Sequence, residues 1–225
     1  MLVADVMPVL AERSIAGLHA SLIEHLPALR PDSAILDLGC GSGAWLARLA
    51  GNGFTNLTGV DQDVAQFGDV PAKVIQLDLD SQTDGVNTIG QFDLITAIEV
   101  VEHVESPAAL LRFVERHLTS TGKLLMTTPN TESTIARLRF LLTGHLKQFD
   151  RKGDTTHITP VFSYPFERIV ARCRMRVISS WTFPENTSPT SAPPIRIAAG
   201  AVRRFLPKAP EGDIVCRLLE RDSAT

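Results

Sequence analysis

Glu99, Glu102 and His103 stand close together in the sequence, and their side chains are of types that transfer protons. On one helical turn, residues three and four positions apart face the same way, so these groups would converge. An imidazole with a reference pKa near ~6.5 is suited to take a proton from a substrate hydroxyl group. The alternative is that the cluster only shapes the floor of a pocket and caps the next helix. His103 is therefore our candidate catalytic residue.

A glycine-rich loop is expected to position the ligand on which such chemistry acts. Gly39, Gly41 and Gly43 alternate directly after the apolar run 34–38, which suits a buried strand. Glycine lets the backbone turn sharply and brings a ligand within reach of the main chain. The run 44–50 then reads as a helix whose free N–H groups face that ligand. The pattern also satisfies a relaxed dinucleotide fingerprint, so an NAD-dependent oxidoreductase stays open at this point.

Asp37 shifts the choice of ligand, because it stands two residues before the first glycine. Its carboxylate would repel a pyrophosphate but attract a ligand that carries an amino group and a sulfonium cation. With Gly39, Gly41 and Gly43 it fills the pattern acidic-x-Gly-x-Gly-x-Gly. The segment thus resembles the first motif of the class I S-adenosylmethionine-dependent methyltransferases. The resemblance implies S-adenosyl-L-methionine as the cofactor.

Further acidic residues are expected to complete the cofactor site. Asp61 ends the apolar run 57–61, 22 residues after Gly39, where a carboxylate reaches the ribose hydroxyls of an adenosine. Gln62 follows on the adenine side, and the resemblance places Asp78 and the Leu79 amide at the adenine ring, with Asp80 as a competitor. Backbone groups at the end of the run 92–98 would lie beside the methionine part. The predicted cofactor-binding residues are Asp37, Gly39, Cys40, Gly41, Ser42, Gly43, Asp61, Gln62, Asp78, Leu79, Ile98 and Glu99.

The stretch from Glu99 to Val104 also resembles that of the ubiquinone-biosynthesis O-methyltransferases and many relatives. In some of them the two acids and the histidine bind a divalent cation. The small-RNA 3′-end 2′-O-methyltransferases use the same spacing with a distant histidine, which His157 would supply. We leave the metal question open, and keep a metal-assisted RNA 2′-O-methyltransferase as an alternative function.

The resemblance covers residues 34–130 well and the remainder loosely. It implies an α/β fold: a Rossmann-like, doubly wound, seven-stranded sheet, mostly parallel, with a C-terminal antiparallel hairpin. The alternation of apolar and amphipathic runs predicts the same parallel sheet with right-handed crossovers. Expected strands are 34–39, 56–61, 73–77, 92–98, 122–128, 175–183 and 213–220, and expected helices are 8–29, 43–51, 107–118, 132–146 and 163–173.

The length of 225 residues suits a single methyltransferase domain, 1–225. We expect a leading helix within 1–30 and lid or substrate elements at 131–172 and 184–211. The net charge of −3 argues against a general nucleic-acid binder. Three widely spaced cysteines favour a reducing, cytoplasmic compartment, and no apolar run approaches the length of a membrane span. The oligomeric state is not predicted.

The acceptor is expected to be a small molecule methylated on a hydroxyl oxygen. A looser resemblance of 137–144 and 157–160 to bacterial methyltransferases encoded with cell-surface sugar pathways favours a sugar or lipid-linked metabolite. A basic group near the pocket mouth would attract a phosphorylated acceptor or allow peripheral contact with anionic lipid, unless it is only a solvated face. A non-catalytic cofactor-binding partner subunit remains a further alternative. The basic group consists of Arg137, Arg139, Lys147 and Arg151.

Overall fold

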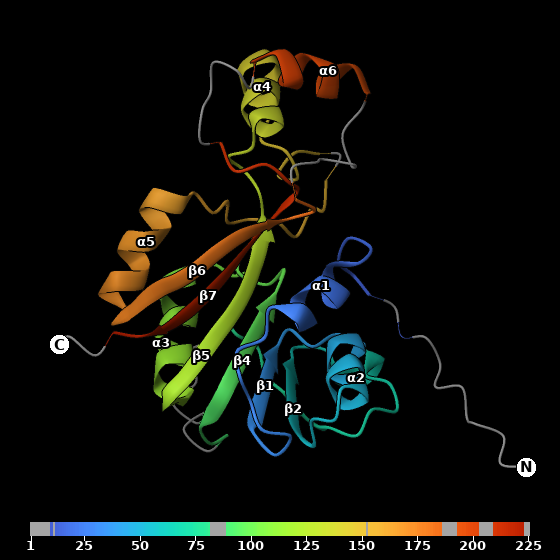
Figure 1. Ribbon diagram of the computed structural model, residues 1–225, viewed down its shortest axis with the longest axis vertical. Coiled ribbons are helices and arrows are strands. Elements are labelled where there is room, and N and C mark those ends of the chain that lie inside the picture. Colours follow the sequence, from blue (N-terminus) through green and yellow to red (C-terminus); the bar gives the residue numbers. More distant parts are fainter. Residues whose placement is uncertain are drawn as a thin grey trace, which may run out of the picture.

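The computed structural model describes residues 10, 12–81, 89–151, 153–185, 193–202 and 209–222. Their strands form a seven-stranded sheet in the order β3-β2-β1-β4-β5-β7-β6 (Figure 1). The first five strands are parallel, and β7 lies antiparallel between β5 and β6. The predicted α/β fold with its C-terminal antiparallel hairpin is confirmed. The strands are β1 (Ala34–Leu38), β2 (Asn56–Asp61), β3 (Lys73–Gln76), β4 (Phe92–Ile98), β5 (Leu118–Pro129), β6 (Met175–Phe183) and β7 (Ile214–Arg221).

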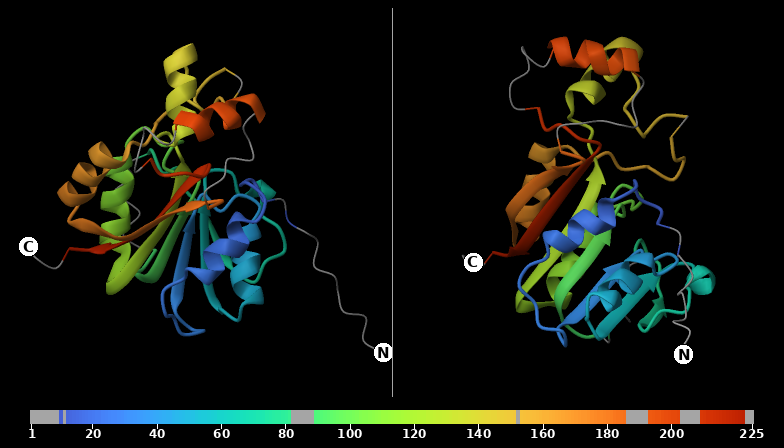
Figure 2. Two further views of the ribbon diagram at one scale, coloured as in Figure 1. Left: turned by 45° about the horizontal axis from the view of Figure 1, so that its top comes forward. Right: turned by 45° about the vertical axis from the view of Figure 1, so that its right-hand side comes forward.

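Helices cover both faces of the sheet because successive strand residues point to opposite sides. Helices α1 (Leu18–Glu24) and α2 (Ala44–Gly51) cover one face, and α3 (Pro107–His117) and α5 (Ser163–Arg172) cover the other (Figures 1 and 2). Ile35 accordingly packs with the first pair, whereas its neighbour Leu36 packs in the cluster of the second pair. The central strands β1 and β4 are therefore buried on both faces, whereas the edge strands β3 and β6 are partly exposed.

Two further helices, α4 (Thr134–Thr143) and α6 (Pro193–Val202), lie against each other away from the sheet. They stand beyond the carboxyl end of β5, at the top of Figure 1. Helix α4 begins at the cap Ser133, whose hydroxyl accepts from the Ala136 N–H, and ends at Gly144 with φ of 70°. None of the helices in the described part of the chain has the length and apolar character that a membrane crossing needs.

The structure shortens two of the expected helices. The leading helix spans only Leu18–Glu24, because Gly17 takes a left-handed conformation with φ of 87° and starts the helix there; residues 1–9 and 11 of the expected segment lie outside the described residues. Helix α4 covers ten residues rather than the run 132–146. Helix α3 starts as predicted, with the Ser106 hydroxyl accepting from the Ala109 N–H and Pro107 in the first position.

Candidate active site

A cavity of about 720 Å³ opens at the carboxyl ends of β1, β2 and β4. The chain order reverses here, because β1 has β2 on one side and β4 on the other, and ligands of open α/β sheets bind at such a switch point. One end of the cavity is formed around the glycine loop, residues 37–44 and 61–62, and we call it the glycine end. The other, the acid end, is lined by Glu99, Val100, His103, Val104, Gly153, Asp154, Thr156 and His157; the fully buried Glu102 stands between these residues in the chain but is not itself part of the lining.

Two of the three glycines in the loop, Gly39 and Gly43, leave no room for a side chain. Gly39 and Gly43 have φ of 67° and 82°, a left-handed region that side chains disfavour. A Cβ atom on Gly39 would lie 2.7 Å from a methyl carbon of Val100, and one on Gly43 would lie 2.8 Å from the ring of Phe67. Glycine is therefore required at these two positions for the loop to keep its path along the cavity.

Asp61 braces this loop from the end of β2. One of its carboxylate oxygens accepts from the Gly41 N–H at 2.8 Å, and the other accepts from the Asp63 N–H at 2.9 Å. An ionised carboxylate has about four lone-pair sites, so Asp61 keeps acceptor capacity for a ligand. Loop and acid thus form one unit, as their spacing predicted.

Asp37 is buried beneath the loop, with only 3% of its surface exposed. Its carboxylate accepts from the Thr96 hydroxyl at 2.7 Å. Burial raises the pKa of Asp37 to about 7, against the effect of that hydrogen bond, and the nearby Asp61 adds to the rise. A buried carboxyl group at the edge of the cavity favours a cationic ligand group beside it.

Asp78 and Asp80 both line the cavity, so the structure does not separate these two candidates for the adenine contact. The Asp78 carboxylate accepts from the Asp80 N–H at 3.0 Å, whereas the Asp80 carboxylate accepts from the Glu105 N–H at 2.8 Å. Asp80 thus ties this loop to the turn before α3. Of the predicted site residues, Gly43 is set back from the cavity wall, and the remainder line it: Asp37, Gly39, Cys40, Gly41, Ser42, Asp61, Gln62, Asp78, Leu79, Ile98, Glu99 and His103.

Two buried carboxyl groups lie at the acid end. Glu99 has a positive φ of 55°, accepts from the Thr127 hydroxyl at 2.9 Å, and has a pKa that burial raises to about 7. Glu102 is fully buried, and neither of its carboxylate oxygens has a hydrogen-bond partner among the described residues. Burial, reinforced by the neighbouring Glu99, raises the pKa of Glu102 well above its usual value. Both carboxyl groups therefore favour the protonated form, or the ionised form with a cation beside it.

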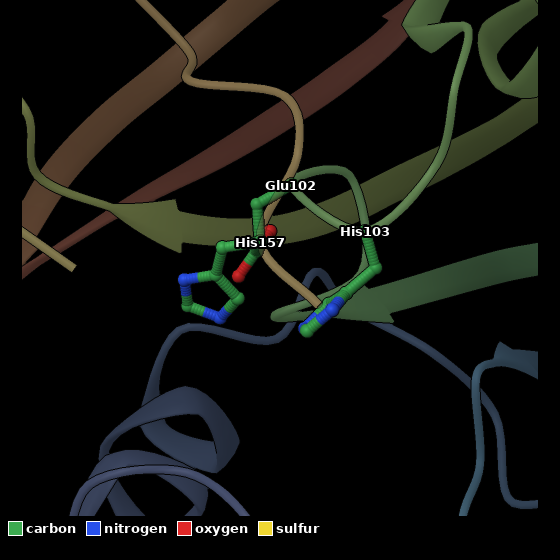
Figure 3. A group of neighbouring side chains, drawn as sticks. All are labelled: Glu102, His103 and His157. Carbon is green, nitrogen blue, oxygen red and sulfur yellow. The ribbon is translucent and has the colours of Figure 1, made fainter. Parts of the chain in front are cut away.

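Glu102, His103 and His157 come together at this end (Figure 3). Each offers a ligand atom, and the three atoms lie within 4.8 Å of one another. The two imidazole rings meet edge to face, with centroids 4.6 Å apart. Desolvation by burial lowers the pKa of His103, and His157 lowers it further. The convergence predicted for the two acids and two histidines thus holds for three of the residues, while Glu99 lies outside this group.

Main-chain hydrogen bonds bring the distant residue His157 to the acid end. The N–H groups of Ile158 and Thr159 both donate to the Glu102 carbonyl at 2.9 Å. The Thr159 hydroxyl donates to the Val104 carbonyl at 2.6 Å. The segment 154–159 is therefore fastened to the turn that follows β4.

Comparison with known proteins identifies the family of this chain. The family model described as "Methyltransferase domain" matches residues 11–168, more than half of the chain. The chain belongs to this methyltransferase family. It is a class I S-adenosylmethionine-dependent methyltransferase, and S-adenosylmethionine is its cofactor. The dinucleotide interpretation of the glycine loop and the non-catalytic alternative are thereby set aside.

Individual relatives agree with this family. A ubiquinone biosynthesis O-methyltransferase of Pseudomonas aeruginosa (strain UCBPP-PA14) is 30% identical over 108 residues, which cover 43% of this chain and 44% of the relative. The match thus spans less than half the length of that relative. A SAM-dependent methyltransferase from Archaeoglobus fulgidus has a similar fold, with a TM-score of 0.62 at 18% identity over 91% of this chain and 93% of the other. The plantazolicin methyltransferase BpumL, solved in complex with SAH, has a TM-score of 0.55 at 19% identity over 84% and 76%.

The glycine end of the methyltransferase fits S-adenosylmethionine. Gly39 and Gly41 let a ligand approach the backbone of the loop, Asp61 retains acceptor capacity for hydroxyl groups, and Asp37 offers negative charge to a cationic group. Each property is a requirement of the adenosine, ribose or sulfonium–ammonium parts of the cofactor.

A third wall of the cavity was not predicted from the sequence. Arg13, Ser14, His19 and Trp45 line it. Trp45 is 3% exposed, and its indole N–H has no hydrogen-bond partner among the described residues. The signal available was a tryptophan in the first helical turn after a glycine loop, where a buried indole N–H needs an acceptor.

The basic group predicted near the pocket mouth has one member, Lys147, next to the lining residue Gln148 in the chain. None of its four residues is among the described residues that line the cavity. Arg139 pairs with Asp150, and the buried Lys147 pairs with Asp213. These cations hold the segments around α4 together, which explains their positions.

Proposed function

We propose that this methyltransferase transfers the methyl group of S-adenosylmethionine to a hydroxyl oxygen of a small molecule, a sugar or a lipid-linked metabolite. The observation that carries the proposal is that one cavity is lined by the glycine loop at one end and by His103, a group able to accept a proton, at the other. The names of the matched relatives support oxygen as the acceptor atom, since they are O-methyltransferases. When bound, S-adenosylmethionine supplies an electrophilic methyl group on its sulfonium.

The residues at the glycine end are proposed to bind and orient the cofactor. Asp61 would accept from the ribose hydroxyls, and Asp37 would face the cationic amino-acid end. The third wall, which includes Trp45, suits the carboxylate of the cofactor's amino-acid part, because the unpartnered Trp45 indole N–H can only donate. Arg13 adds positive charge, and it is the single arginine or lysine among the described residues lining the cavity. Asp78 and Leu79 would contact adenine, while the backbone of Ile98 and Glu99 would lie along the methionine part.

His103 is proposed to be the general base. Because burial lowers its pKa, the imidazole is neutral near pH 7 and able to accept a proton from the acceptor hydroxyl. The surrounding walls would hold that hydroxyl in line with the methyl group and exclude water, and such positioning supplies much of the acceleration.

A lipid-linked acceptor is supported by the surface of α4. Its residues Phe140, Leu141 and Leu142 are 51%, 79% and 76% exposed, an apolar strip on the lid region 131–172. The proposed single domain would use this region and 184–211 as substrate elements. Peripheral contact with a membrane would occur through the same strip. A cytoplasmic location is supported by three buried, free cysteines.

A second candidate is a metal-assisted reaction, favoured by the two unpartnered oxygens of Glu102. Glu102, His103 and His157 would then hold Mg²⁺ or Mn²⁺, which lowers the pKa of the acceptor hydroxyl. A polyanionic acceptor such as RNA is less well supported, because Arg13 is the lone arginine or lysine among the described residues of the cavity wall. Titration of Mn²⁺ into the protein tests this candidate. Binding that is lost in Glu102→Gln and kept in Glu105→Gln would favour it, and absence of binding would remove it.

The proposed function is tested with isotope-labelled S-adenosylmethionine and fractionated pools of metabolites. We expect label on a hydroxyl oxygen of a sugar or lipid-linked compound, at a rate that His103→Ala reduces. Label on nitrogen, sulfur or carbon would contradict it. Label on RNA would instead favour the metal-assisted RNA 2′-O-methyltransferase.

A further inference from the structure

A short chain of hydrogen bonds joins His103 to an aspartate that none of the motifs includes. The Thr156 hydroxyl lies 2.6 Å from a carboxylate oxygen of Asp154, and the same hydroxyl oxygen lies 2.8 Å from Nδ1 of His103. Thr156 and His103 are 53 residues apart in the sequence. All three side chains line the acid end of the cavity.

The donors and acceptors in this chain follow from elementary chemistry. The two hydrogen bonds from Thr156, one from its hydroxyl and one from its N–H, hold the pKa of Asp154 below its usual value, so that carboxylate is ionised and can only accept. The single hydroxyl proton of Thr156 is therefore donated to Asp154. The oxygen of that hydroxyl is left to accept, so Nδ1 of His103 must carry a proton. Nε2 is then the nitrogen of the neutral ring that keeps its lone pair.

We propose that Thr156 and Asp154 are positioning residues that hold His103 in the Nδ1–H tautomer and thereby make Nε2 the base for the acceptor hydroxyl. This inference rests on the proposed function, in which His103 removes that proton. It gives the segment 154–159 a role beyond shaping the lid, because a neutral imidazole in the other tautomer would present an N–H where a lone pair is needed.

The rest of the acid end agrees with this assignment. Nδ1 of His157 lies 3.0 Å from the backbone carbonyl of Gln148, which can only accept, so His157 also carries its proton on Nδ1. The segment that supplies Thr156 is held by the bonds from Ile158 and Thr159 to the Glu102 carbonyl. Each imidazole is thus oriented by a partner of fixed polarity.

The experiment is two-bond ¹H–¹⁵N correlation spectroscopy of the full chain labelled on histidine, recorded at pH 8 without ligand. The chain has six histidines, and His103→Ala identifies the signal of His103. We expect the Nδ1–H pattern in the wild type. Thr156→Val should move the signal toward the Nε2–H form and slow methyl transfer about 10–100-fold. Thr156→Ser, which keeps the hydroxyl, should restore both.

Asp154→Ala separates the relay from a merely structural role of the threonine. Without the carboxylate, the Thr156 hydroxyl is free to donate to Nδ1, so the variant should favour the Nε2–H tautomer although the threonine is intact. Affinity for S-adenosylhomocysteine, measured by calorimetry, should stay within about twofold of wild type in all these variants, which shows that they fold.

The outcomes are distinguishable. An Nε2–H pattern in the wild type, or a pattern unchanged by Thr156→Val and Asp154→Ala, overturns the proposal. A changed tautomer with slower transfer supports it. A changed tautomer with normal transfer supports the assignment of Thr156 and Asp154 as the residues that set the tautomer, and overturns instead the proposed role of His103 as the base.

Discussion

The two ends of the cavity are built in different ways. The glycine end is formed mainly by backbone groups of one strand–helix–strand unit. Within this unit the Asp61 carboxylate accepts from the Gly41 N–H. At the acid end, side chains from distant segments meet, and Glu102 is buried without any hydrogen-bond partner among the described residues. The proposed cofactor site is therefore built on a local turn, whereas the proposed acceptor site depends on tertiary contacts.

Replacing His103 by alanine should have the largest effect, because it removes the proposed base at the acid end and leaves the glycine end intact. As the proposed base, it should slow methyl transfer by about 10²–10⁴-fold while S-adenosylhomocysteine affinity is unchanged. His145→Ala, on an exposed histidine just after α4, is the matched control. Steady-state rates and calorimetry measure the two quantities. Normal turnover in His103→Ala would reduce the acid end to a structural role.

Replacing Asp37 by asparagine should have the next largest effect, on the stability of the ligand-free protein. Burial raises the pKa of Asp37 to about 7, so the folded protein binds a proton there more tightly than the unfolded chain, whose value is near ~3.9. The group's contribution to stability is thus fully present below the unfolded value and is lost as the pH rises through about 7. Asparagine does not ionise and keeps an acceptor for the Thr96 hydroxyl.

The variant should therefore be more stable than wild type at pH 8, by on the order of 3 kcal/mol, and similar to it near pH 4. Urea unfolding at both pH values measures this difference. Asp32→Asn, on an exposed turn, should show no such gain. If Asp37→Asn raised the free energy of unfolding equally at both pH values, ionisation of the buried Asp37 would not be the cause of its effect on stability.

Replacing Asp61 by alanine tests whether the glycine end binds the ribose of the cofactor. The change leaves the ribose hydroxyls and the Gly41 N–H without their acceptor, so S-adenosylhomocysteine should bind about 2 kcal/mol or more weakly. The neighbouring Asp63→Ala removes a cap of the short 3₁₀ turn Val64–Gln66 and is the control. Unchanged affinity in calorimetry would remove Asp61 from the ribose contact.

Replacing Trp45 by phenylalanine should have the smallest effect and tests the wall that the sequence reasoning missed. Loss of the indole N–H should weaken S-adenosylhomocysteine by about 1 kcal/mol but leave 5′-methylthioadenosine, which lacks the amino-acid end, unaffected. The other tryptophan, Trp181, also has a buried, unpartnered N–H and lies outside the cavity, so Trp181→Phe is the matched control. Equal weakening of both ligands would assign Trp45 a packing role only.

Much of this site was predictable because its signals are local. The spacing of Gly39, Gly41 and Asp61 encodes one turn, and their positions at adjacent strand ends follow from parallel pairing. Helix lengths were less predictable: the apolar run 8–29 continues past Gly17, whose left-handed backbone starts the helix later. The ion pairs of Arg139 and Lys147 were not predictable, since their carboxylate partners, Asp150 and Asp213, are identified only by the folded chain.

The family, the sheet and the glycine loop could be read from the amino-acid sequence, because glycine conformation, apolar runs and short acid spacings act over a few residues. The folded chain was needed to show which groups meet at the proposed acceptor site. Thr156 and His157 reach His103 through a lid segment fastened to the Glu102 carbonyl, and Trp45 faces the cavity through the packing of α1 on α2. Such contacts depend on the distance between atoms in space, which the separation of residues along the chain does not specify.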